Sequence, residues 1–116
     1  MALPKLSADA TPEEMAELLG QARKASEILK ALSHETRLLI LCLLSEGEKS
    51  VSDLEEVMSM PQAAVSQQLA RLRFDGLVTT RREGRMMYYS IAGEEVSSIV
   101  EELYELFCEP VRSKKK

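Results

Sequence analysis

The two cysteines of the chain, Cys42 and Cys108, are the residues best suited to covalent chemistry. A thiolate is a nucleophile and a soft ligand, so two neighbouring thiols could react with other sulfur compounds, whereas a buried lone thiol is inert. A structural disulfide is not expected, because cytosolic thiols stay reduced. Taken alone, the residues leave two interpretations open: a reactive pair, or a small core residue at Cys42 with an unreactive thiol at Cys108.

Five arginines form a second informative group in an otherwise acidic chain. The formal net charge is −4. Residues 62–90 hold the five arginines against two acidic residues, a local charge of +3, so the rest of the chain carries −7. Because phosphate contact is local, an acidic protein with one basic face can bind DNA. A solvated arginine face is the alternative.

The pattern of residues 62–74 predicts a helix that follows Pro61 and has two different faces. Val65, Leu69 and Leu72 form an inward stripe at helical spacing. Glutamine can bond adenine, serine can bond bases or phosphates, and alanine can touch a thymine methyl, so the opposite face suits a major groove. Arginines on the next hairpin would meet phosphates or a narrow minor groove. A solvated amide-rich helix is the alternative. The expected DNA contacts are Gln62, Ala63, Ser66, Gln67, Arg71, Arg81, Arg82 and Arg85.

Capping residues and apolar periodicity indicate the elements that hold these residues. Thr11 and Glu14 form a capping box for a first helix that begins at Pro12. Ser33 is expected to cap a second, buried helix, and Ser50 a short third helix with Val51, Leu54 and Val57 inward. The expected helices are 12–32, 34–45, 51–58, 62–74 and 94–108.

Residues 77–82 and 85–91 favour two strands, and Glu83-Gly84 between them is typical of a hairpin turn. Four helices, a hairpin and a last helix give the order of a winged helix-turn-helix. The predicted fold class is therefore mainly α with a small β-hairpin (α+β), with five helices plus a β-wing. We expect a flexible tail at 1–10, the domain at 11–109, and a flexible basic tail at 110–116.

A chain of 116 residues fits one domain, whose modest core cannot easily cover the apolar stripes of both terminal helices. We therefore expect a homodimer through the first and last helices, with recognition helices roughly 34 Å apart. Packing of both stripes within one subunit is the alternative. No apolar run approaches about 18 residues and no signal-peptide pattern is evident, so a cytoplasmic location without membrane contact is expected.

Three linked motifs resemble the ArsR/SmtB family. Residues 32–41 (LSHETRLLIL) resemble its second helix, residues 62–73 with 76–78 resemble its recognition helix and exit, and residues 81–89 (RREGRMMYY) resemble its wing. The similarity covers about residues 15–108. It implies a dimeric repressor that binds double-stranded operator DNA and leaves it when an inducer binds.

The metal sites of that family match this chain poorly. One site type begins the third helix with Cys-Val-Cys-Asp-Leu, where this chain has Ser50-Val51-Ser52-Asp53-Leu54. Hydroxyl groups are poor ligands for soft metals. The other site type uses His and acidic residues on the last helix, but the only histidine, His34, lies in the second. No metal is therefore expected, and no cofactor, because a Gly-rich phosphate loop is absent.

The placing of Cys42 and Cys108 resembles a subgroup of the family, the dithiol reactive-sulfur sensors represented by SqrR and BigR. The resemblance implies that the two cysteines form persulfides and then a di- or polysulfide bridge. Such a bridge would bias the spacing of the recognition helices and release operator DNA. A general disulfide redox-sensing repressor is the alternative, with a metal-responsive repressor, a thiol redox enzyme or a winged helix for protein contact less favoured.

Overall fold

The structure is a computed structural model that describes residues 10–113, and the chain divides into two units, residues 1–30 and 31–116. Most of the tail predicted at 1–10, and residues 114–116 of the tail predicted at 110–116, lie outside the described residues. None of the helices between residues 10 and 113 is both long and apolar enough to cross a membrane.

The first unit consists mainly of helix α1 (Pro12–Leu32), which begins at the expected capping box. The Thr11 N–H donates to Glu14 Oε1 (3.2 Å), and the Glu14 N–H donates to Thr11 Oγ1 (3.1 Å). Several apolar side chains of this helix are exposed: Met15, Leu18, Leu19 and Leu29. The helix therefore carries exposed apolar side chains.

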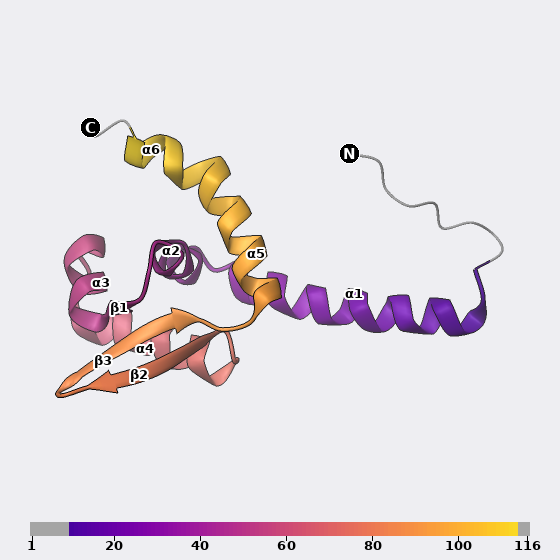
Figure 1. The fold of residues 1–116 in the computed structure, drawn as a ribbon, viewed down its shortest axis with the longest axis horizontal. Helices are drawn as coiled ribbons and strands as arrows, with labels where there is room; N and C mark the ends of the chain where they lie inside the picture. Colours follow the sequence, from indigo (N-terminus) through magenta and orange to yellow (C-terminus); the bar gives the residue numbers. More distant parts are fainter. Residues whose placement is uncertain (1–9, 114–116) are drawn as a thin grey trace. The chain divides into compact units, whose positions relative to one another are not determined.

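The second unit contains the remaining elements (Figure 1). In chain order they are α2 (Glu35–Leu44), β1 (Lys49–Ser50), α3 (Val51–Met58), α4 (Gln62–Phe74), β2 (Val78–Glu83), β3 (Met86–Ile91), α5 (Glu94–Leu103), the π-helical turn η1 (Tyr104–Cys108) and α6 (Glu109–Ser113). The segments α5, η1 and α6 follow one another without a break. With these three counted as one, residues 10–113 form five helices and a β-hairpin, which confirms the predicted winged helix-turn-helix.

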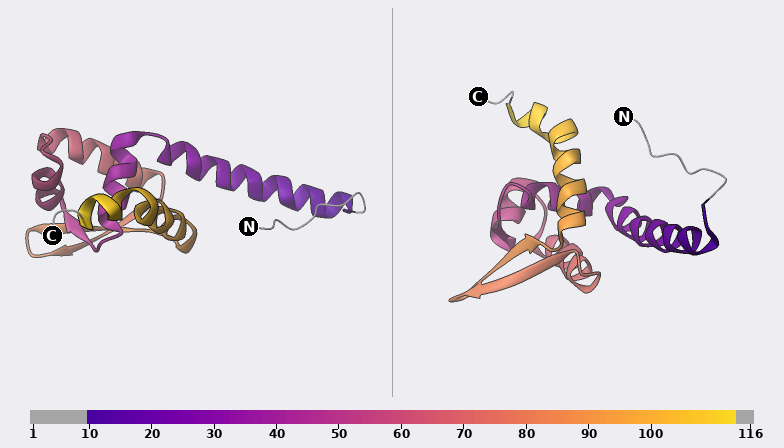
Figure 2. Two further views of the ribbon diagram at one scale, coloured as in Figure 1. Left: turned by 90° about the horizontal axis from the view of Figure 1, so that it is seen from above. Right: turned by 45° about the vertical axis from the view of Figure 1, so that its right-hand side comes forward.

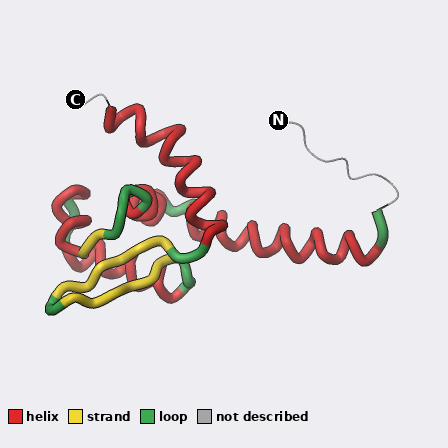
Figure 3. Tube along the Cα trace, in the orientation of Figure 1, coloured by secondary structure: helices red, strands yellow, loops and turns green. Residues whose placement is uncertain are grey.

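The hairpin extends as an arm away from the start of α5 (Figures 1 and 2). β2 and β3 pair antiparallel from Val78–Ile91 to Glu83–Met86. The turn therefore consists of Gly84 and Arg85, one residue later than expected, and Gly84 supplies the positive φ of 62° that the turn needs. The short strand β1, which the sequence analysis did not predict, pairs with β3 to give the order β1-β3-β2 (Figure 3).

Helix α2 is the centre of the core, as its apolar run predicts. Ile40 and Leu41 are fully buried, and further buried side chains come from α3, α4 and α5, including Leu54, Leu69 and Val100. α2 contacts α4, α5 and β3. A change in the position of α2 would therefore reach both the recognition helix and the C-terminal helices.

Three boundary and burial predictions are wrong. The N-cap of α2 is His34 rather than Ser33, because the His34 carbonyl accepts the first helical bond from the Leu38 N–H. Val57 is 52% exposed rather than inward, since of the residues of short helix α3 only Leu54 is buried. The last helix continues past 108 to Ser113. Pro110 would clash with a regular α-helix, and the wider η1 turn before it accommodates the ring.

Candidate nucleic-acid interface and dithiol pocket

α3 and α4 form the helix-turn-helix. α3 starts at a capping box in which Ser50 Oγ accepts from the Asp53 N–H (3.1 Å) and Asp53 Oδ2 accepts from the Ser50 N–H (3.0 Å). These bonds lower the pKa of Asp53. α3 ends at Ser59, whose left-handed backbone (φ 53°, ψ 43°) reverses the chain before Pro61 begins α4. The tight turn fixes α4 against α3.

α4 has the two faces that its sequence predicts. Val65, Leu69 and Leu72 are 0% exposed and anchor the helix in the core. The side chains expected to read DNA lie on the other face: Gln62, Ala63, Gln67 and Arg71 are exposed and Ser66 is half-buried. This face therefore has the exposure that major-groove contact requires, and its contact with bases stays a prediction.

A hydrogen bond joins α2 to α4. Arg37 Nε donates to Gln68 Oε1 at 3.2 Å in a partly buried position. Gln68 stands beside the predicted base-reading residue Gln67, so this bond helps to fix the rotation of α4 about its axis. The sequence analysis missed both partners, because an interaction over 31 positions has no local pattern.

Arg71 is paired only weakly within the chain. Its Nε lies 3.3 Å from Asp75 Oδ2, one helical turn further on, and its side chain is 61% exposed. Exposed ion pairs of this kind contribute little, about 0–1 kcal/mol. Arg71 therefore keeps its guanidinium accessible to a phosphate.

Arg81 of the wing is held by its own chain. Its guanidinium bonds the carboxylate of Glu48, in the loop before β1, and Nη1 donates to Glu83 Oε2 at 2.7 Å. Its carbon Cζ also lies 4.8 Å from the ring centroid of Tyr88. The bonds raise the pKa of Arg81 and lower that of Glu48. The predicted phosphate contact of Arg81 therefore competes with two carboxylates.

Arg82 and Arg85 differ from Arg81 in this respect. Both are exposed, and no carboxylate between residues 10 and 113 pairs with either of them. Arg82 follows Arg81 on β2, so its side chain leaves the opposite face of the sheet. Arg85 lies in the hairpin turn. These two residues are the wing cations most available to DNA.

The second functional feature is the pair of cysteines, which line one pocket. Cys42 of α2 is 4% exposed, and Cys108, at the end of η1, is half-buried. Both thiols are free. Burial, then the charge of Cys108, then a hydrogen bond between the two thiols raise the pKa of Cys42. The structure thus brings together two thiols that are 66 positions apart in the sequence.

The π-helical turn helps to explain how Cys108 reaches α2. Val100 is fully buried on α5, which packs against α2. In a regular α-helix each residue rotates by about 100° about the helix axis. The eight positions from Val100 to Cys108 would therefore place Cys108 about 80° around the axis from Val100. A π turn rotates less per residue, and η1 therefore moves Cys108 back toward that side. The sequence analysis did not predict this turn.

The two thiols line a pocket of about 270 Å³ between α2, α3 and the C-terminal helical segment. Most of the wall is apolar, with Leu39 and Leu43 from α2, Val57 and Met58 from α3, and Phe107 and Val111 from the last segment. The exposed position of Val57 is explained by this pocket. A small apolar or sulfur-containing molecule therefore has space beside both thiols.

A polar cluster lies at the same pocket. Glu46 accepts a hydrogen bond from the Tyr104 hydroxyl (2.7 Å) and one from Arg112 Nη2 (2.8 Å). The bond to Glu46 raises the pKa of Tyr104, and the charge of Glu46 raises that of Arg112. Because Glu46 follows α2 and the other two residues lie on η1 and α6, this cluster clamps the C-terminal segment over the cysteines.

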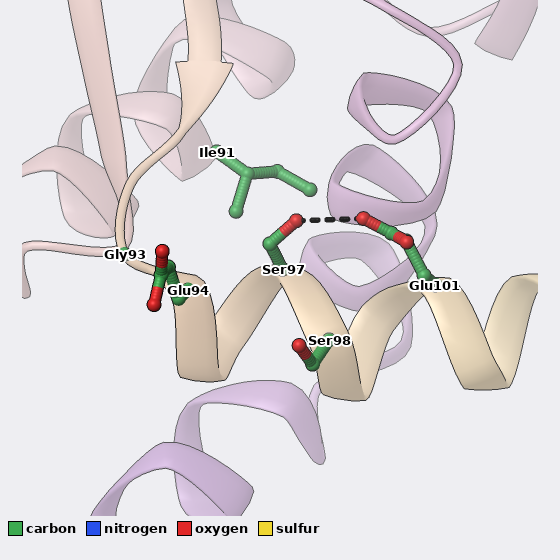
Figure 4. A pocket seen from close by; sticks show the side chains of 6 residues that line it. All are labelled: Ile91, Gly93, Glu94, Ser97, Ser98 and Glu101. Atoms are coloured by element: carbon green, nitrogen blue, oxygen red, sulfur yellow. Dashed lines mark hydrogen bonds between the residues drawn. The ribbon is translucent and has the colours of Figure 1, made fainter.

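A separate pocket lies at the start of α5, where Figure 4 shows Ile91, Gly93, Glu94, Ser97, Ser98 and Glu101. Ser97 Oγ donates to Glu101 Oε2 at 2.9 Å, and the lining offers two carboxylates without a histidine or cysteine. In the part of the chain that the structure describes, no three His, Cys, Asp or Glu residues are arranged to hold a metal. This pocket therefore lacks the nitrogen and sulfur ligands that zinc uses.

The fold, the exposed face of α4 and the arginine-bearing hairpin define a winged helix-turn-helix regulator of transcription. Residues 34–80 match the model of the bacterial regulatory protein, arsR family. The chain is 41% identical over 98 residues to the transcriptional activator HlyU of Vibrio cholerae, with 84% of this chain and 91% of that protein covered. It is 40% identical over 90 residues to the biofilm growth-associated repressor of Agrobacterium fabrum, and this alignment covers 78% of this chain and 77% of that protein.

The crystal structure of the transcriptional regulator HlyU from Vibrio vulnificus superposes with a TM-score of 0.77 at 42% identity, over 81% of this chain and 98% of that one. The chain therefore belongs to the arsR family of bacterial regulatory proteins, a family of DNA-binding transcriptional regulators. Its relatives are regulators rather than enzymes.

Proposed function

We propose that the protein is a homodimeric cytoplasmic repressor that senses reactive sulfur species through Cys42 and Cys108 and releases operator DNA when they are bridged. The observation that carries this proposal is that both cysteines line one largely apolar pocket. Similarity to a biofilm growth-associated repressor supports repression as the direction of control.

The exposure of the two thiols sets the order of reaction. Half-buried Cys108 attacks the outer sulfur of a hydropersulfide, RSSH, to form a Cys108 persulfide and release RSH. Buried Cys42 then loses its proton and attacks the inner sulfur of this persulfide, which forms the Cys42–Cys108 disulfide and releases hydrogen sulfide. In total, two thiols and one RSSH give one disulfide, one RSH and one H₂S. Each further RSSH adds one sulfur to the bridge and releases one more RSH.

The bridge would act on DNA binding through α2. It joins η1 to α2, and α2 contacts α4 and bonds it through Arg37 and Gln68. A covalent link that shifts α2 would therefore change the position of α4. Coupling free energies between two sites are typically about 1–3 kcal/mol, or roughly 5- to 150-fold in affinity.

Dimerisation through the first and last helices is part of the proposal. α1 exposes apolar residues such as Leu19, and the C-terminal segment exposes Leu106, Phe107 and Val111. Exposed apolar surface of this extent is typical of an interface. A twofold dimer would present two α4 helices to two half-sites of an operator.

The experiment combines DNA binding with intact-protein mass spectrometry. A duplex selected by the reduced protein from a random library serves as operator, and an organic hydropersulfide is the reagent. The unsubstituted chain should lose both free thiols and release DNA, whereas Cys42→Ser and Cys108→Ser should bind DNA normally and stay bound when the reagent is added. Release of DNA from either variant would disprove a switch that needs both thiols.

The mass of the bridged protein separates the two thiol mechanisms. Added sulfur atoms in the bridge support sensing of reactive sulfur. A loss of two hydrogens alone, produced equally by a disulfide or peroxide reagent, would favour a general redox-sensing repressor instead.

A further inference from the structure

Three sulfur-containing side chains meet at the pocket between α2, α3 and the C-terminal segment. Cys42 comes from α2, Cys108 from the end of η1, and Met58 from the last turn of α3. The two cysteines and Met58 line the same space of about 270 Å³. The sequence analysis did not connect Met58 with the cysteines, because it lies 16 positions after Cys42 and 50 before Cys108 and only the folded chain places all three at one pocket.

We propose that reduced Cys42 and Cys108, together with Met58, form a binding site for a soft monovalent metal ion, Cu(I). Thiolate and thioether ligands select Cu(I) over harder ions. Zinc, in contrast, usually takes four ligands from Cys, His, Asp and Glu. In the described part of the chain no such group of three is present, and His34 does not line the pocket. The sulfur set therefore favours Cu(I), which needs fewer ligands.

The charges around the pocket fit this ion. When Cu(I) binds, both thiols lose their protons, so Cu⁺ and two neutral thiols give one complex of charge −1 and two released protons. The guanidinium of Arg112 lines the same pocket and is held in place by Glu46 at 2.8 Å. It offers a positive charge near the complex, beside the Glu46 carboxylate that also lines the pocket, and the buried side chain of Leu43 forms part of the apolar wall.

Copper binding is distinct from the proposed sulfur chemistry and excludes it, since both use the same two thiols. A metal-bound thiolate no longer attacks a persulfide. A chain loaded with Cu(I) should therefore resist bridging until a copper chelator removes the ion.

The test is an anaerobic titration of the reduced full-length protein with Cu(I), in competition with a chromophoric Cu(I) chelator. One ion per chain should bind, with thiolate-to-copper absorption and a sulfur-only coordination shell in X-ray absorption. Met58→Leu keeps the side-chain volume and should weaken Cu(I) binding by about 10- to 100-fold. Met60→Leu, in the turn outside the pocket lining, is the matched control and should leave the affinity unchanged.

Three results would overturn the site: the same affinity in Met58→Leu as in Met60→Leu, an unchanged number of sulfur neighbours in Met58→Leu, or tighter binding of Zn(II) than of Cu(I). The titration uses neither DNA nor a sulfur donor, so failure of the proposed sensing function would not affect it. Met58→Leu should also still form the Cys42–Cys108 bridge. Bridge formation in this variant would show that the pocket is intact and that the lost affinity reflects the loss of a metal ligand.

Discussion

Replacement of Arg82 by glutamine should make DNA binding less dependent on salt. Arg82 is exposed and has no carboxylate partner in the described chain, so its charge is free to meet a phosphate. Each lost phosphate contact reduces the slope of log K against log salt by about 0.9, and a dimer loses two contacts, so the slope should fall by about 1.8. Fluorescence anisotropy of a labelled operator over a series of salt concentrations measures this slope.

Arg81→Gln is the matched control, one position away on the opposite face of the sheet. Glu48 and Glu83 already bind the guanidinium of Arg81, so its loss should change the slope much less. Glu48→Gln leaves Glu83 as the one carboxylate on Arg81 in the described chain and should steepen the slope, by up to about 1.8. An unchanged slope in Arg82→Gln, together with a large change in Arg81→Gln, would show that Arg81 rather than Arg82 contacts phosphate. That result would refute the reasoning.

Three further substitutions test other parts of the structure. The capping bonds hold the pKa of Asp53 below its unfolded value of about 3.9. The ionised carboxylate therefore stabilises the fold fully above the unfolded pKa. This contribution is lost as the pH falls through the lower pKa of the folded state. Asp53→Asn should therefore flatten the acid side of a plot of unfolding free energy against pH from urea titrations. Leu69→Ala, at a fully buried position, should cost about 2–5 kcal/mol in the same assay, and a negligible loss would contradict its burial. Leu106→Glu should convert dimer to monomer in analytical ultracentrifugation, whereas Phe74→Glu, at an even more exposed apolar residue on α4, should not; equal effects would reject the proposed interface.

The sequence predicts the helices and the hairpin well because their cause is local. The capping boxes at Thr11 and Ser50 and the stripe of Val65, Leu69 and Leu72 each lie within a few residues, and the structure confirms them. β1 escaped prediction because two residues are too short to show alternation. The sequence analysis ended the last helix too early. Proline usually stops a helix, and no sequence pattern predicts the π turn that accommodates Pro110.

The site is less predictable, since its interactions join distant segments. Glu48 meets Arg81 across 33 positions, and the sequence gives no means of pairing them. Likewise, Tyr104 and Arg112 reach Glu46 from 58 and 66 positions away. The resemblance named Cys42 and Cys108 as a pair, but only the folded chain shows that they line one pocket and that Met58 lines it too.

The decisive experiment is the operator Kd of protein in which the Cys42–Cys108 bridge has been formed and verified by mass, compared with the Kd of the reduced protein. We predict that the bridged form binds roughly 5- to 150-fold more weakly and that a reductant restores the original Kd. Equal Kd values for the fully bridged and reduced forms would contradict control of DNA binding by these thiols.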